Sequence, residues 1–333
     1  MTYTEALEAV YADRLNRKQG YVEIPISLFI DKVDVNMPSI PEIAFYQFKG
    51  EKAEVIKPAT QAYSPLALSL HETIWIKAED LELLRRFVES VILKPSDSAG
   101  AFPSEKRMEI LRRSAIMIMD DLFIEPSPEN INKSVKVVRS FVYVMMKEPK
   151  AYLLLIKLSS HDPYTLQHSV GTAVNAIILA KKLGITAENE LLDIGMAGLL
   201  HDIGKVRIKK EIINKAGPLN EQEWEEMRQH SKEGYEIVKD NPNLSERTKK
   251  AILEHHEDKV GTGYPNGLKL EQLDVFSKIV SICDIFNALT TDRTYAKART
   301  AFEAFQFMRD KLGHKIDDDI FKQLVLVYGG KID

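Results

Sequence analysis

The chain has 333 residues, a net charge of −4, 44% hydrophobic and 28% charged residues, and one cysteine. This length suits about two domains, the charge argues against binding a DNA or RNA polymer, and the single cysteine excludes an internal disulfide framework. Because the N-terminus has no apolar signal segment and no run approaches the ~18 apolar residues of a membrane span, we expect a cytoplasmic protein with no membrane span.

Residues 1–95 are expected to form a small α/β module with a regulatory or interaction role. Alternating residues predict a strand over 21–30, and residues 43–58 are typical of a β-hairpin. The segment 72–93 predicts a strand that leads into an amphipathic helix. Residues 94–106 are rich in Pro, Ser, Gly and Ala, which predicts a linker.

The chain from about residue 104 onward is predicted to be almost entirely helical. Two helices with helical apolar spacing are expected between residues 105 and 146, so that 96–150 hold the linker and connecting helices. Residues 151–333 are predicted to form an all-α domain with at least five helices. The overall fold class is therefore α+β.

Capping residues predict where several helices of this domain begin and end. Asp162 can cap a helix that Gly184 ends, and an apolar, buried helix follows over residues 188–204. Asn220 is a candidate N-cap of the segment "LNEQEWEEMRQHSKEGYEIVKD", and Ser245 is one for the next helix. Residues 275–292 predict another long helix.

Histidines are concentrated in the helical domain, and histidine is the commonest transition-metal ligand. A single histidine on a helix is more often a hydrogen-bonded core residue, and this alternative stays open for each one taken alone. Asp284 lies among apolar residues, where a carboxylate is costly unless it is paired or bound to metal. Six of the eight histidines lie between residues 161 and 256: His161, His168, His201, His230, His255 and His256.

Residues 160–315 resemble the HD-GYP family, a branch of the HD-domain metal-dependent phosphohydrolases. The resemblance covers nearly half of the chain and leaves the first 150 residues unassigned. The motifs that carry it are "YTLQHS" with His168, "LLHDIGK" with His201, Asp202 and Lys205, "KAGPLNEQE", "HSKEG" with His230, "HHEDKVGTGYPNGL" with His255, His256 and Gly263-Tyr264-Pro265, and "ICDIFNALTTDRTYAKA" with Asp284 and Arg293.

The resemblance implies a hydrolase that cleaves the bacterial second messenger cyclic di-GMP to pGpG, and in some members on to GMP. It also implies two divalent metal ions, iron or manganese, whose histidine-rich ligands suit these ions better than magnesium. One ion would be held by His168, His201, Asp202 and Asp284. The other would be held by His230, His255 and His256, with Asp202 as a bridge that also serves catalysis.

The family pattern also implies substrate contacts and partners. Lys205 is expected to offset charge on the phosphate, and Arg293, Lys297 and Tyr264 are expected to contact the dinucleotide. Lysine after a helix-ending glycine can instead simply favour the helix dipole. The 261–266 loop would flank the site and meet a GGDEF diguanylate cyclase. For the N-terminal module, ligand sensing, homodimerisation and binding of a partner all stay open.

Several positions depart from the family pattern. Tyr164 replaces a glutamate that supports a third metal in some members, so two metals are expected here. The departures at Val260, Asp258, Asn287 and Ala296 concern the substrate more than the metals. They leave two alternatives open, a receptor or adaptor that binds cyclic di-GMP or a GGDEF partner with weak or no turnover, and a phosphohydrolase for another nucleotide.

Overall fold

The computed structural model describes residues 15–25, 42–59, 74–84, 104–147, 165–215, 217–291 and 297–329. The chain divides into two compact units, Met1–Ile110 and Leu111–Asp333. Each unit is described by itself below, and the domain boundaries near residues 95 and 150 stay predictions. No helix among the described residues has both the length and the hydrophobicity that crossing a membrane requires.

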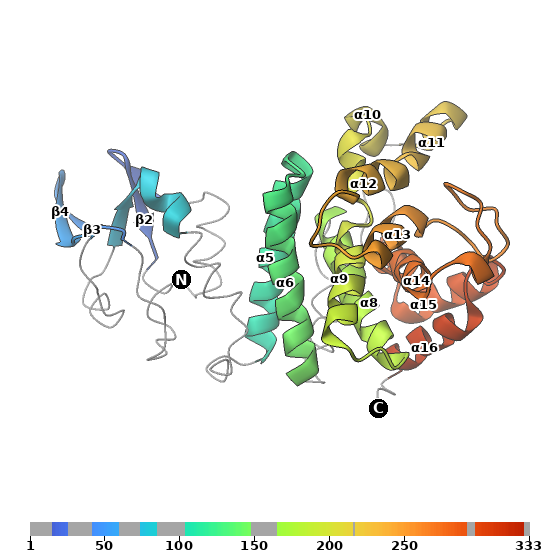
Figure 1. Cartoon of the computed structure of the whole chain (residues 1–333). Helices are drawn as coiled ribbons and strands as arrows, with labels where there is room; N and C mark the ends of the chain where they lie inside the picture. The colour runs from blue at the N-terminus through green and yellow to red at the C-terminus, as the bar shows by residue number, and fades with distance from the viewer. Residues whose placement is uncertain are drawn as a thin grey trace. The chain divides into compact units, whose positions relative to one another are not determined.

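The first unit contains an antiparallel five-stranded sheet in the order β1-β2-β5-β3-β4 (Figure 1). The predicted hairpin is confirmed, because β3 and β4 pair with Lys49 opposite Lys52. The predicted strand followed by a helical turn is confirmed up to residue 84, and the rest of the predicted helix and most of the linker lie outside the described residues. The elements are β1 (Arg17–Lys18), β2 (Tyr21–Ile24), β3 (Phe45–Lys49), β4 (Lys52–Lys57), β5 (Ile74–Lys77) and the 3-10 turn η1 (Ala78–Asp80).

The second unit is helical, as predicted, and Figure 1 shows its helices from green to red. The long helices are α5 (Ser104–Ile124, which begins in the first unit), α6 (Pro128–Lys147), α8 (Thr165–Lys182), α9 (Glu188–Leu200), α14 (Val275–Thr290) and α16 (Asp318–Tyr328). The shorter ones are η3 (Ile203–Arg207), α10 (Lys210–Ile213), α11 (Glu221–Arg228), α12 (His230–Val238), α13 (Glu246–Glu254), η4 (Leu270–Gln272), α15 (Ala301–Phe307) and η5 (Met308–Leu312).

Helices α8, α9 and α14 pack together at the centre of this unit. The close packing of α8 on α9 depends on Gly198, because a Cβ there would lie 2.7 Å from Cα of Ala173. Almost all described side chains from Val170 to Ala180 are fully buried, and so is most of the last two turns of α9. The apolar run ends in "LLHD", and its last two residues, His201 and Asp202, therefore lie buried at the C-terminal end of α9.

The predicted helix caps are confirmed where the structure describes them. The Asn220 side chain accepts from the amide of Glu223, whose carboxylate accepts in return from the amide of Asn220. Ser245 caps α13, because its side chain accepts a hydrogen bond from the amide of Thr248. The sequence predicts one helix after Asn220, but the structure has two, because the helix breaks at Gln229. His230 therefore begins α12 and does not lie deep within a helix.

Candidate metal centre

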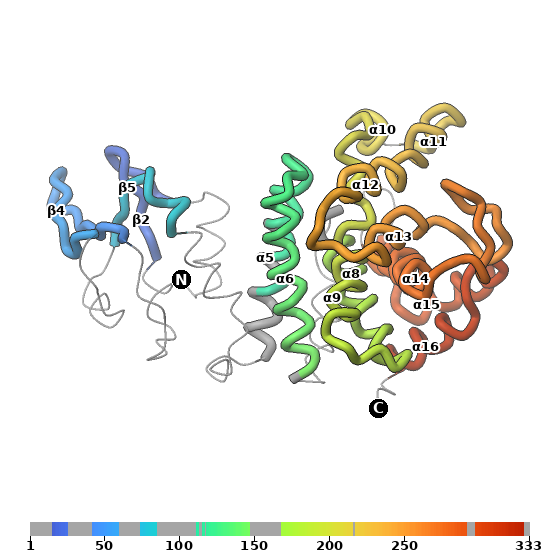
Figure 2. Tube along the Cα trace, viewed as in Figure 1, coloured from blue at the N-terminus to red at the C-terminus, as the bar shows by residue number. Residues whose placement is uncertain are grey.

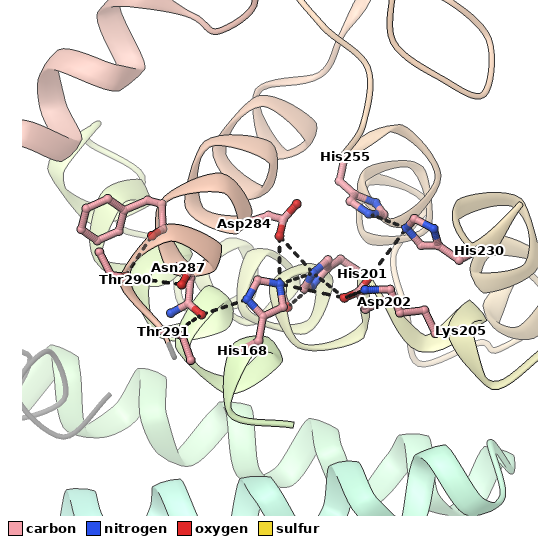
Figure 3. Close-up of polar contacts among 12 residues, drawn as sticks. His168, His201, Asp202, Lys205, His230, His255, Asp284, Asn287, Thr290 and Thr291 are labelled. Atoms are coloured by element: carbon pink, nitrogen blue, oxygen red, sulfur yellow. Dashed lines mark hydrogen bonds and ion pairs between the residues drawn. The ribbon is translucent and has the colours of Figure 1, made fainter. Parts of the chain in front are cut away.

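Six of the seven predicted metal ligands form two groups in which the ligand atoms lie within 4.8 Å of one another. The first cluster contains His168 from α8 with His201 and Asp202 from the end of α9. The second cluster contains His230 at the start of α12 with His255 and His256 just after α13. Figure 3 shows Asp202 between the two clusters, which come from four different helices.

In the first cluster, nitrogen and carboxylate atoms converge on one point. Nε2 of His168 and Nε2 of His201 lie 3.3 Å apart, and Oδ2 of Asp202 lies 3.4 Å from Nε2 of His201. Asp284, the seventh predicted ligand, joins from α14 with Oδ1 2.9 Å from Nε2 of His168 and 3.7 Å from Nε2 of His201. All four predicted ligands of the first ion are therefore together and less than 10% exposed.

In the second cluster, the rings of three histidines face one another. Nε2 of His230 lies 3.2 Å from Nε2 of His255, and the ring centroids of His255 and His256 lie 4.1 Å apart. Asp202 reaches this cluster with its other oxygen, because Oδ1 lies 3.5 Å from Nε2 of His230. One carboxylate therefore has one oxygen at each cluster, as a bridging ligand requires.

Helix ends fix the orientation of three of the ligand rings. The last carbonyls of a helix have no partner within the helix. Nδ1 of His201 donates to the carbonyl of Gly198, Nδ1 of His230 to that of Met227, and Nδ1 of His255 to that of Ile252, at 2.7–2.8 Å. Each of these histidines thus donates to the carbonyl three residues earlier in the chain and points its Nε2 atom into the cluster. The same hydrogen bond therefore satisfies a carbonyl at the helix end and orients the ring.

This geometry fits divalent metal ions. Two nitrogen ligands at about 2.1 Å from one ion and at right angles to each other lie about 3 Å apart, close to the 3.2 and 3.3 Å separations of the two Nε2 pairs. In the second cluster the neutral rings direct their Nε2 lone pairs at one another, which is unfavourable without a cation. Imidazole and carboxylate ligands suit iron, manganese or zinc, whereas magnesium prefers oxygen ligands alone.

His168 has a different partner from the other three histidines. Its Nδ1 donates to Oδ1 of Asn287 on α14 at 2.9 Å, and Thr291 donates to the same oxygen at 3.2 Å. Asn287 is buried and lies one helical turn after Asp284. The residue that the sequence marks as a departure therefore sets the tautomer and orientation of a predicted ligand, which is a common role for a group behind a metal site.

Replacement of Asn287 by alanine is expected to weaken metal binding at the first cluster. The His168 ring would lose its hydrogen-bond acceptor, and loss of such a partner typically costs about 10–100-fold in metal affinity or activity. Calorimetric titration of metal-free protein with Mn²⁺ measures the effect. Asn287→Asp keeps the acceptor and is the matched control, and equal affinities of the Ala variant and the wild type would contradict this role.

The two clusters differ in charge. Burial disfavours the ionised carboxylate of Asp202, but the charges of Lys205 and His201 outweigh it and hold its pKa well below the usual range. Burial likewise opposes charge on His201, yet Asp202 and Asp284 outweigh it and raise the pKa of His201 to about 10. Burial lowers the pKa of His230 and His255, and lowers that of His256 to about 3.

These shifts predict how the stability of the metal-free protein depends on pH. Below about pH 6.5 the unfolded chain protonates His255 and His256 while the folded chain does not, so stability falls as the pH falls toward 3. Between about 6.5 and 10 the folded chain retains a proton on His201 that the unfolded chain releases, so stability falls as the pH rises.

We therefore expect maximal stability of the chelator-treated protein near pH 6.5. Each group contributes a slope of up to about 1.4 kcal/mol per pH unit within its window. Urea unfolding at several pH values measures this dependence. An unchanged unfolding free energy between pH 5 and 8 would contradict it.

Among the predicted substrate contacts, Lys205 and Tyr264 lie at the site. Nζ of Lys205 donates to Oδ2 of Asp202 at 2.5 Å, so that Lys205 borders the clusters. The Tyr264 ring lies 4.7 Å from the ring of His256, centroid to centroid. Lys297 is exposed and belongs to neither cluster. Arg293, Tyr164 and Ala296 lie outside the described residues.

Two carboxylates that directly follow the histidine pair shape the loop between α13 and α14, the orange segment in Figure 2. Glu257 accepts from the amides of Asn266 and Leu268, and Asp258 accepts from both the amide and the hydroxyl of Thr262. The sequence marks Asp258 only as a departure from the family pattern. In the structure it holds the turn that presents Tyr264 to the second cluster.

Buried histidine and aspartate side chains on packed helices define a class of protein, the helical proteins whose clustered histidines and carboxylates could hold metal. Residues 155–320 match the model of the HD domain family. The chain belongs to this family, and the resemblance to its HD-GYP branch is confirmed by curated relatives of that type.

Two relatives illustrate the similarity. A cyclic di-GMP phosphodiesterase of Pseudomonas aeruginosa, PA4108, is 36% identical over 185 residues, which are 56% of this chain and 44% of that protein. The 3'3'-cGAMP-specific phosphodiesterase 3 of Vibrio cholerae is 32% identical over 167 residues, which are 50% of this chain and 36% of that protein. The chain thus spans less than half the length of these relatives.

A solved structure shares the fold over most of the chain. The HDG"Y"P protein Bd1817 from Bdellovibrio bacteriovorus superposes with a TM-score of 0.66 and 19% sequence identity. The match covers 93% of this chain and 100% of that one. The α+β fold class predicted from the sequence is therefore confirmed.

Proposed function

We propose that the protein is a two-metal phosphodiesterase that hydrolyses cyclic di-GMP to pGpG. The observation that carries this proposal is the position of Asp202, with one oxygen at each histidine cluster. Two divalent ions, when bound there, would polarise a phosphate and lower the pKa of a water molecule. The relatives that are named for cyclic di-GMP and 3'3'-cGAMP support a cyclic dinucleotide as the substrate.

The chain's own residues have separate roles in this proposal. His168, His201 and Asp284 would hold one ion, the three histidines of the second cluster would hold the other, and Asp202 would serve as a ligand to both. Lys205, whose ammonium borders the bridge, would donate to a phosphate oxygen and offset the charge that develops there. Tyr264 forms part of the wall next to the second cluster. Iron or manganese is the expected metal.

The remaining parts of the proposal rest on the sequence alone. These are a cytoplasmic location, contact of the 261–266 loop with a GGDEF diguanylate cyclase, further cleavage of pGpG to GMP, phosphate contacts of Arg293 and Lys297, and a regulatory or dimerising role for residues 1–95.

A substrate panel tests the proposed reaction. The protein is loaded anaerobically with Fe²⁺ or Mn²⁺ and incubated with cyclic di-GMP, 3'3'-cGAMP, cyclic di-AMP or pGpG, and the products are separated by ion-exchange chromatography. We expect pGpG from cyclic di-GMP with the highest kcat/KM. Faster cleavage of 3'3'-cGAMP would assign the second relative's substrate instead. Binding of cyclic di-GMP to the metal-loaded protein without any product would indicate a receptor and overturn the enzyme.

A further inference from the structure

A pocket of about 680 Å³ lies beside the second cluster, and most of the residues that line it are not predicted metal ligands. His255 and His256 form part of its wall, and Tyr264 forms another part. The rest of the wall includes four side chains of α11 and, near the C-terminus, Lys315. The α11 residues that line it are Glu221, Trp224, Glu225 and Arg228.

These four residues follow helical spacing, at positions i, i+3, i+4 and i+7, and therefore occupy one face of α11. Trp224 is 47% exposed although tryptophan carries a large apolar surface. A flat aromatic ring at the edge of a polar pocket is the usual platform for a nucleobase, because every base has an apolar face that can stack on it.

The charge of the pocket argues against a phosphate at this position. Four carboxylates line it, those of Glu221, Glu225, Glu257 and Asp258, against the two cations Arg228 and Lys315. Glu257 and Asp258 already accept hydrogen bonds from the loop. Glu221 and Glu225 of α11 are therefore the carboxylates of the pocket that could accept hydrogen bonds from the N–H groups of a ligand. Glu225 also accepts a hydrogen bond from Arg228 at 2.7 Å.

We propose that this pocket binds one guanine base of the dinucleotide, stacked on Trp224 with its N1–H and 2-amino group donating to the α11 glutamates. The inference rests on the proposed function, because metal ions held by the histidine clusters next to the pocket would bind the phosphate. Adenine presents an acceptor at N1, which a carboxylate cannot satisfy, so an adenine base is expected to bind this pocket more weakly than guanine. Arg228, which also lines the pocket, has its guanidinium 5.9 Å from the Tyr264 ring centroid.

Tryptophan fluorescence tests the proposal directly, because the chain has two tryptophans and only Trp224 lies in the second unit. In a Trp75→Phe background, the metal-loaded protein is titrated with phosphorothioate analogues of cyclic di-GMP and cyclic di-AMP, which resist hydrolysis. We expect saturable quenching with cyclic di-GMP and at least about tenfold weaker binding of the adenine analogue. The double variant Glu221→Gln, Glu225→Gln should lose most of this preference.

Kinetics provide the second test. For Trp224→Ala, the ratio of kcat/KM for cyclic di-GMP to that for bis(p-nitrophenyl) phosphate, which has no base, should fall about 5- to 150-fold, the factor for a stacking energy of about 1–3 kcal/mol. Phe302→Ala is the matched control, since Phe302 is exposed on α15 and does not line the pocket.

The outcomes separate this inference from the proposed function. Turnover of cyclic di-GMP without quenching, or with an unchanged ratio in Trp224→Ala, would overturn the base site and leave the enzyme intact. Guanine-selective quenching without turnover would support the base site and overturn the enzyme. Equal quenching by the guanine and adenine analogues would overturn guanine recognition.

Discussion

Replacement of Asp202 by asparagine is expected to abolish hydrolysis of the cyclic dinucleotide and to lower the metal content of the protein. Asp202 has one oxygen at each cluster, so the variant weakens both sites at once. Loss of a group that only orients a ligand costs about 10–100-fold, and loss of a ligand shared by two ions should therefore cost roughly 10³-fold or more in kcat.

Metal analysis and rate measurements on the same sample test this prediction. Glu211→Gln is a suitable control because it removes one negative charge from an exposed position on α10. Circular dichroism shows whether the variant is folded, since Asp202 also pairs with Lys205. Retention of two ions and more than a tenth of the wild-type rate would contradict the bridging role.

Replacement of Gly204 by alanine is expected to destabilise the second unit strongly. Gly204 lies between Asp202 and Lys205, where η3 packs on the first turns of α12. A Cβ there would lie 1.9 Å from the carbonyl oxygen of His230 and 2.4 Å from the amide nitrogen of Gly234. Because both are backbone atoms, the helices must move apart, and we expect a loss of about 3–5 kcal/mol in unfolding free energy.

The movement also separates the two clusters, because Gly204 follows Asp202 and contacts the backbone of His230. Metal affinity should fall together with stability. Urea unfolding of the metal-free protein measures the loss, with Gly217→Ala as the matched control, since a Cβ at Gly217 meets no atom within 4 Å. A decrease below about 1 kcal/mol for Gly204→Ala would show that the helices tolerate the extra carbon.

The residues of the two clusters could be predicted from the sequence because their motifs follow the order and composition of the family pattern. What the sequence could not provide is why each ring points inward. The Nδ1 atoms of His201, His230 and His255 donate to carbonyls in the last turn of a helix, which have no helical i+4 partner because the helices end nearby. The break at Gln229, two residues after Met227, interrupts a segment whose pattern predicts one helix.

The sequence also did not predict the roles of residues that depend on contacts between segments far apart in the chain. Asn287 is 119 residues from His168 in the chain, so that its role behind the first cluster depends on the packing of α8 against α14. Asp258 accepts hydrogen bonds from Thr262 in the loop, and Trp224 lines a pocket together with residues far from it in the chain. In the first unit, the hairpin follows from local alternation, whereas the insertion of β5 between β2 and β3 depends on pairings that no local pattern records.

The most direct test of the central claim is a stepwise anaerobic titration of metal-free protein with Mn²⁺, in which bound metal, the electron paramagnetic resonance spectrum and the rate of cyclic di-GMP hydrolysis are followed together. Two ions joined by Asp202 should give an exchange-coupled spectrum, and both this spectrum and the activity should appear with the second equivalent. Full activity at one equivalent, or two bound ions without coupling, would contradict a bridged two-metal centre.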